Sequence, residues 1–94
     1  MITIAPRFTV TQDGATINIY HADAGEGLPA HSHEYSHLTM CFAGRCMVRN
    51  PRKALEIDKN TQPINLLAGE WHEIEALDDG TVFANVFSTS HAVG

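Results

Sequence analysis

The sequence predicts an all-β domain, a sandwich or a small barrel, and three observations support this fold class. No stretch of eleven or more residues repeats apolar positions with the period of a helix. Short alternating or β-rich runs occur instead, separated by residues typical of turns. Seven or eight such runs at this spacing are typical of a sandwich or a small barrel. Residues 1–94 are expected to form one domain, since domains commonly contain on the order of 100 residues.

Each expected strand begins or ends at a turn. In order along the chain the strands cover residues 2–10, 15–22, 37–42, 45–50, 54–57, 64–67, 71–77 and 81–88. Residues 23–29, D-A-G-E-G-L-P, contain two glycines and a proline, and this composition predicts a loop. Ala43-Gly44 lies between two of the runs and predicts a tight hairpin that joins them.

Composition limits the classes of partner. The net charge is −5, from 6 basic and 11 acidic residues, so a nucleic-acid backbone is not an expected partner. No apolar run reaches the roughly 18 to 20 residues of a membrane helix, and residues 1–7 do not resemble a signal peptide. Two cysteines make no disulfide framework. These features predict a cytoplasmic protein that binds neither nucleic acid nor membrane.

The six histidines are unusual in number and in position. Three of them, His31, His33 and His37, fall within seven residues and share odd numbering, so a continuous strand would direct all three to one face. If residues 34–36 loop out instead, the ends still lie close enough for one ion. His72, on another expected strand after Gly69, is the candidate for a fourth ligand. The alternative is that these are ordinary surface histidines.

Two segments resemble the motifs of the cupins. Gly25-x5-His31-x-His33-x3-His37-x6-Gly44 has the spacing of the first cupin motif, with His37 where the family usually has a metal-binding glutamate. Residues 67–76 resemble the second motif through Gly69 and His72, although Leu67 replaces its proline and Ala76 its asparagine.

The resemblance implies a small cupin β-barrel, also described as a jelly roll or double-stranded β-helix. It also implies that a metal ion is bound by His31, His33 and His72, with His37 in the fourth place. Four neutral imidazoles suit a divalent transition metal such as Fe, Ni, Cu, Zn or Mn better than Mg²⁺ or Ca²⁺. They leave the positive charge of the ion uncompensated, so the expected small-molecule ligand is anionic or enolisable.

Other residues are candidates for roles beside the ion. Tyr35 lies between the histidines and is a candidate to contact a substrate, or else an ordinary half-buried aromatic residue. Glu34 is the nearest carboxylate and a conceivable general base, although its numbering favours an outward side chain. Asn18 and Tyr20 share one strand face, which we expect to line the pocket. Asn85, in an apolar run, is expected either to support an imidazole or to make a structural hydrogen bond.

The leading functional hypothesis is a small metalloenzyme that acts on a small oxygenated molecule. A dioxygenase-like oxidoreductase is favoured over an isomerase or lyase, because no well-placed carboxylate base is evident. The alternatives are a non-catalytic module that binds or senses a small ligand, and an ion that only stabilises the fold.

A homodimer is also expected, because the core is small and an alternating N-terminal strand can pair with a neighbouring subunit. That strand carries Ile2, Ile4, Phe8 and Val10. The competing interpretation is a monomer in which this strand folds back onto its own sheet.

Overall fold

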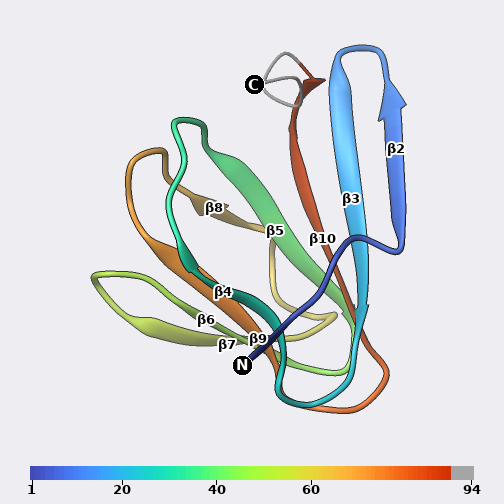
Figure 1. Cartoon of the computed structure of the whole chain (residues 1–94), viewed down its shortest axis with the longest axis vertical. Coiled ribbons are helices and arrows are strands. Elements are labelled where there is room, and N and C mark those ends of the chain that lie inside the picture. The colour runs from blue at the N-terminus through green and yellow to red at the C-terminus, as the bar shows by residue number, and fades with distance from the viewer. Residues whose placement is uncertain (90–94) are drawn as a thin grey trace.

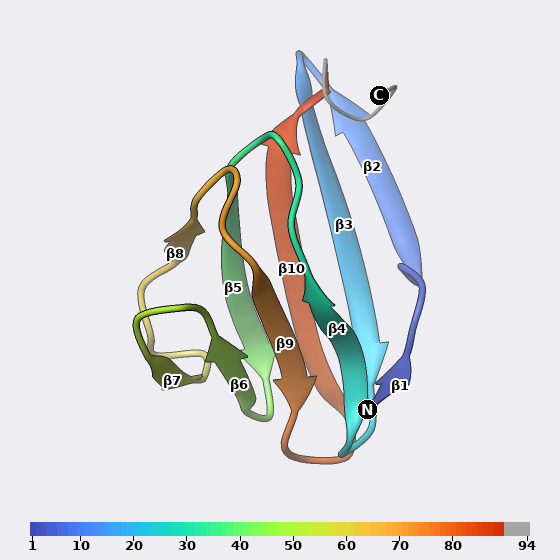
Figure 2. The ribbon, with the colours of Figure 1, turned by 60° about the vertical axis from the view of Figure 1, so that its left-hand side comes forward.

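The computed structural model describes residues 1–89, which form two five-stranded sheets packed face to face (Figures 1 and 2). We call them sheet A, with strand order β1-β4-β9-β6-β7, and sheet B, with order β2-β3-β10-β5-β8. The strands are β1 Ile2–Thr3, β2 Phe8–Gln12, β3 Ala15–Ala22, β4 Glu26–His31, β5 His37–Ala43, β6 Cys46–Arg49, β7 Ala54–Ile57, β8 Ile64–Leu66, β9 His72–Ala76 and β10 Thr81–Ser88. No helix within residues 1–89 is long and apolar enough to cross a membrane.

The core lies between the two sheets, on the strand faces that point inward. Phe83 of β10 and Ile74 of β9 are completely buried, and Tyr20 stacks on Phe83 with ring centroids 4.8 Å apart. Cys41 and Cys46 are buried free thiols in the same core. The all-β prediction is therefore confirmed, and from β3 onward seven of the strands lie within one residue of the expected ranges.

The prediction of a loop over residues 23–29 was wrong, since β4 begins at Glu26 and pairs with β9. Gly27 explains the error. A Cβ atom there would clash with the carbonyl oxygen of Ile74, so the glycine allows two strands to approach closely.

The predicted hairpin at Ala43-Gly44 was also wrong. β5 belongs to sheet B and β6 to sheet A, so this turn carries the chain from one layer to the other. Gly44 has φ +67°, a conformation that side chains with a Cβ rarely adopt, and it packs against Thr81.

The expected N-terminal strand is divided into two. β1 pairs with β4 in sheet A in the parallel direction, and β2 pairs with β3 in sheet B in the antiparallel direction. Both parts thus fold back onto the chain's own sheets, as the competing interpretation held, while the homodimer stays a prediction.

The outer faces of the two sheets differ in polarity. On sheet A, Arg49 forms ion pairs with Glu73 at 3.2 Å and Glu75 at 2.9 Å. The strands of sheet B contain no Lys, Arg, Asp or Glu. Two rows of register partners cross its outer face, Phe8–Ile19–Ala84–Met40 and Val10–Ile17–Val86–Leu38.

Candidate metal centre

Four histidines from both sheets meet at one end of the sandwich. His31 ends β4 and His72 begins β9, and the two are register partners in sheet A. His37 is the first residue of β5 in sheet B. His33 lies in the connection between β4 and β5, so the three clustered histidines are not on one continuous strand. The chain loops out between them and still brings them together.

Two hydrogen bonds attach the segment before His72 to this connection. The Gly69 amide donates to the carbonyl oxygen of His33 at 2.8 Å. The Ala68 amide donates to Ser36 Oγ at 2.9 Å. They hold the start of β9 against the residues between β4 and β5, although the two segments are more than 30 residues apart.

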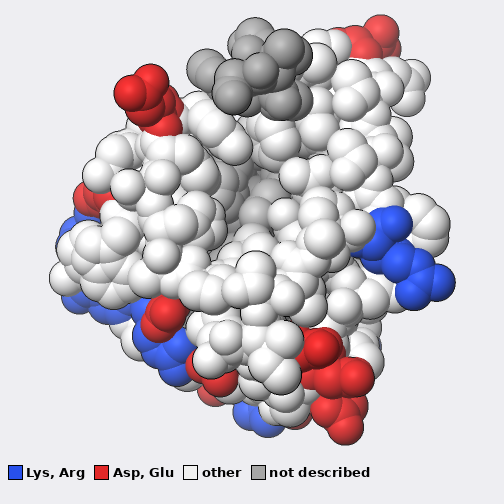
Figure 3. Space-filling view, in the orientation of Figure 1, with Lys and Arg blue, Asp and Glu red and all other residues white. Residues whose placement is uncertain are grey.

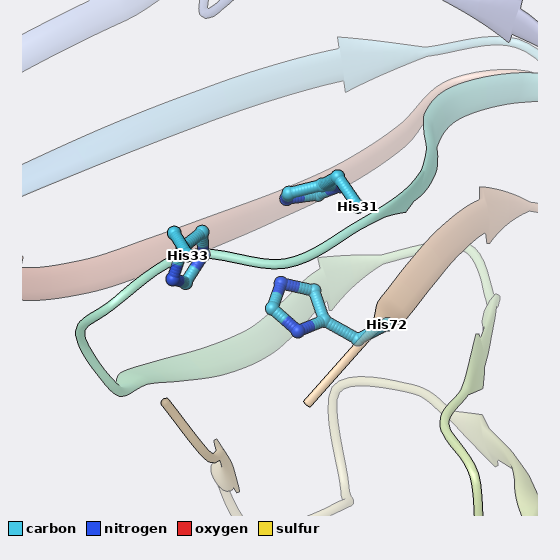
Figure 4. A group of neighbouring side chains, drawn as sticks. All are labelled: His31, His33 and His72. Carbon is cyan, nitrogen blue, oxygen red and sulfur yellow. The ribbon is translucent and has the colours of Figure 1, made fainter. Parts of the chain in front are cut away.

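His31, His33 and His72 form a group suited to holding a metal ion (Figure 4). Each offers a ring nitrogen, and these nitrogens lie within 4.8 Å of one another. The ring centroid of His72 lies 4.6 Å from that of His31 and 4.9 Å from that of His33.

His37 lies directly beside this group. Its Nε2 atom is 3.2 Å from Nε2 of His72, and the two ring centroids are 5.0 Å apart. Both side chains are almost fully buried, with 4% of His37 and 1% of His72 exposed. The structure thus gathers all four histidines expected from the sequence, three of them within the group defined above.

Each histidine is held in one tautomer by a partner on its Nδ1 atom. A carbonyl oxygen can only accept a hydrogen bond, so Nδ1 must carry the proton where it contacts one. Three rings donate in this way from Nδ1 to a carbonyl oxygen. His31 donates to Pro29 at 2.7 Å, His33 to Tyr35 at 2.6 Å and His72 to Glu70 at 3.2 Å. In all three rings the lone pair is therefore on Nε2.

His37 has the same tautomer for a different reason. The Thr39 hydroxyl donates to Asn85 Oδ1 at 2.7 Å, so its oxygen accepts the proton of His37 Nδ1 at 3.1 Å. Thr39 is completely buried. Asn85 was expected either to support an imidazole or to make a structural hydrogen bond, and it contacts His37 only through Thr39, which was not among the expected residues. The signal was its place two residues after His37, on the same face of the strand.

Burial keeps the inner imidazoles neutral. Desolvation, reinforced by the neighbouring histidines, lowers the pKa of His37 and that of His72 from 6.5 to about 4. Desolvation also lowers the pKa of His33. Neutral imidazole is the form that binds a transition metal, so these rings are ready to bind one at neutral pH.

A pocket of about 130 Å³ opens beside the histidines, and its lining contains no Asp, Glu, Lys or Arg. Figure 3 shows a hollow in this face of the molecule, with the charged residues toward the rim. Asn18 and Tyr20 line the pocket, which confirms the strand face expected to point inward, while His21 on the opposite face is exposed.

The two candidate catalytic residues lie in different places. Tyr35 lines the pocket and stacks on His33, with ring centroids 4.1 Å apart and planes 9° from parallel. Glu34 is exposed and is not part of the pocket lining.

Solved structures with a similar fold include proteins described as cupins. No family model matches the sequence, and no curated protein matches it. KdgF from Halomonas sp. matches with a TM-score of 0.77 and 16% identity, over 86% of this chain and 76% of that one. A cupin-2 domain protein from Shewanella frigidimarina matches with a TM-score of 0.73 and 9% identity, over 89% and 79%. A cupin superfamily protein from Desulfitobacterium hafniense matches with a TM-score of 0.68 and 12% identity, over 84% of this chain and 71% of that one.

These likenesses establish the fold of the chain. The protein has the cupin fold, a double-stranded β-helix, as the two sequence motifs implied. At the place where its two sheets meet, three histidines form a group that could hold a metal ion.

Proposed function

We propose that this protein binds one divalent transition metal through His31, His33, His72 and His37. The contact between Nε2 of His37 and Nε2 of His72 carries this proposal. Both nitrogens present a lone pair at 3.2 Å, because both Nδ1 atoms hold the proton. Two lone pairs repel, and a cation that both can bind turns this repulsion into attraction.

The donor set fits a transition metal better than a hard cation. Four imidazoles are neutral nitrogen ligands, which suit Fe, Ni, Cu, Zn and Mn, whereas Mg²⁺ and Ca²⁺ prefer oxygen. The hydrogen bonds from the four Nδ1 atoms orient the rings and raise their basicity. When bound, the ion would supply Lewis acidity and, if it is iron or another redox metal, the ability to activate O₂.

We further propose a dioxygenase-like reaction, in which both atoms of O₂ enter a small oxygenated substrate. Such a reaction needs no other reductant and no strong base. The pocket favours it, because no carboxylate lines the cavity and Glu34 is exposed. An isomerase or lyase would need a group that moves a proton. Tyr35 is the proposed contact for the substrate, since its ring lies against His33 at the pocket wall.

Metal content tests the binding proposal. Purified wild-type protein is expected to contain close to one transition metal ion per chain by elemental analysis, and His37→Ala and His72→Ala to lose most of it. His21→Ala is the matched control, since His21 is exposed on the opposite face of β3. Folded wild-type protein that takes up none of the five metals would refute the proposal.

Oxygen consumption by iron-loaded protein tests the reaction. Uptake that depends on an added oxygenated compound, and that is lost in His72→Ala, would support dioxygenase activity. Saturable binding of such compounds without uptake or turnover would refute it and favour a module that binds or senses a small ligand.

We also propose that two copies pair through the outer face of sheet B. Phe8, Val10 and Leu38 expose between 42% and 53% of their surface on a sheet without charged residues. Exposed apolar faces of this kind mark interfaces. A second copy offers an equally apolar sheet face, bordered by Arg7 beside Phe8, which suits a two-fold symmetric contact.

Molecular mass in solution tests the pairing. The wild type is expected to be a dimer, and Val10→Lys with Leu38→Lys to be a monomer. The control is Met47→Lys on the outer face of sheet A, which should stay dimeric. A monomeric wild type would refute the interface.

A further inference from the structure

A row of four polar residues crosses the inner face of sheet B beside the histidines. Thr9, Asn18, Asn85 and Thr39 are successive register partners on β2, β3, β10 and β5. Direct partners in an antiparallel pair have Cβ atoms about 4.5 to 5.5 Å apart. The amides of Asn18 and Asn85 are therefore neighbours, and both line the pocket. We call these two side chains the amide pair.

The two threonines fix the direction of the amide pair. The Thr9 hydroxyl donates to Asn18 Oδ1 at 2.8 Å, and the Thr39 hydroxyl donates to Asn85 Oδ1 at 2.7 Å. Each amide oxygen is thus engaged, and each NH₂ group is left to donate. Asn85 is only 6% exposed, and its side chain lines the pocket. A ligand bound in the pocket can accept hydrogen bonds from these NH₂ groups.

Tyr20 adds a third donor on the same face. Burial raises the pKa of the Tyr20 hydroxyl, an effect that a hydrogen bond from the Asn18 side chain opposes in part. The hydroxyl stays protonated at neutral pH. Tyr20 lines the pocket, so its protonated hydroxyl can donate a hydrogen bond to a ligand there.

The chemistry of the pocket defines its ligand. Side chains that could neutralise a cationic ligand are absent from the lining, which has no Asp or Glu. A metal ion held by four neutral imidazoles would also favour an anion. The volume of about 130 Å³ is similar to that of an engineered cavity that holds benzene, so about six to eight non-hydrogen atoms fit.

We propose that the amide pair receives an oxygen atom of a small carboxylate that also binds the ion at the histidines, a 2-oxo or 2-hydroxy acid. This inference rests on the proposed metal site and adds the class of its substrate. An amino acid of the same size is rejected, because its ammonium group would face N–H and O–H donors.

Ligand binding to cobalt-loaded protein tests the inference, since the visible absorption of Co²⁺ changes when a ligand reaches it. Pyruvate and L-alanine share a carbon skeleton and are the two probes. Pyruvate is expected to give a saturable change, and alanine to bind at least tenfold more weakly. Asn18→Ala removes a donor to a charged ligand and should weaken pyruvate binding about tenfold. Asn85→Asp places a negative charge there and should abolish it.

The control is Asn65→Asp, an exposed amide on β8, which should bind pyruvate like the wild type. All variants should keep their cobalt, because neither amide is a metal ligand. Cobalt uptake followed by equal binding of the two probes, or by unchanged pyruvate binding in Asn18→Ala and Asn85→Asp, overturns the inference alone. Failure of the wild type to take up cobalt overturns the metal site and the inference with it.

Discussion

Acidification of the metal-free protein should destabilise it through His37 and His72. In the folded chain the pKa of each is lowered from 6.5 to about 4. The unfolded chain therefore binds these protons at a higher pH than the folded chain does. Stability is complete above pH 6.5 and is lost as the pH falls from 6.5 toward 4, because proton uptake favours the unfolded state in that window.

The size of the effect follows from the two pKa values. Between pH 7.5 and pH 5 the linkage relation gives a loss of about 2 kcal/mol for each histidine, and about 4 kcal/mol for both. A domain of this size is stable by roughly 5 to 15 kcal/mol, so the loss is a large fraction of the total.

Urea unfolding at the two pH values, with a chelator present, measures this loss. In His37→Gln and in His72→Gln the difference between pH 7.5 and pH 5 should shrink by about 2 kcal/mol, since each variant removes one of the two titrating groups. His21→Gln, at an exposed position, should keep the wild-type difference. If the three variants and the wild type lose the same stability, or if the wild type is more stable at pH 5, the reasoning is refuted.

Three other perturbations test the site and the fold. Thr39→Val leaves His37 Nδ1 and Asn85 Oδ1 unpaired in the core. The variant should therefore lower the free energy of unfolding in urea by about 1 to 3 kcal/mol and weaken metal binding about 10- to 100-fold. Thr39→Ser should restore both stability and metal binding, and failure to do so would contradict the role of the hydroxyl. Gly27→Ala should lower stability by about 3 kcal/mol or more in thermal unfolding, because the new Cβ meets the Ile74 carbonyl. The control is Gly14→Ala, where the space is open but φ is +82°, and it should lower stability by only about 1 kcal/mol. Equal losses in the two variants would contradict the clash at Gly27. Free metal at a hundred times its dissociation constant should stabilise the wild type by about 2.7 kcal/mol and His72→Ala much less; an equal gain in both would place the ion elsewhere.

The sequence was informative about strands because their inward faces alternate with outward ones. β3, β7 and β10 have the expected ends, since turn residues bound each of them. The sequence did not predict where the chain passes from one sheet to the other. Gly44 looks like the turn of a hairpin, but whether the next strand returns to the same sheet depends on the packing of the opposite layer. In the same way Gly27 suggested a loop, although its role is the close approach of β9.

The site was predicted as a set of residues and not as a network. The spacing within two short motif-like segments selected the four histidines that the structure brings together, His31, His33 and His37 from the first and His72 from the second. The hydrogen bond from Thr39 to Asn85 joins residues 46 positions apart, and it exists only because β5 and β10 pair in one particular register. No local pattern contains that register, so the support of His37 and the direction of the amide pair required the structure.

The placement of the four histidines connects the proposed chemistry to the stability of the fold. His31 and His72 belong to sheet A, His37 belongs to sheet B, and His33 lies on the connection between the two sheets. An ion bound by all four would join the sheets at the end where the pocket opens, and would replace the repulsion of the two facing Nε2 lone pairs. A chain of 94 residues buries only a small core. We therefore expect removal of a bound ion to loosen the sheets at this end before the core around Phe83 unfolds.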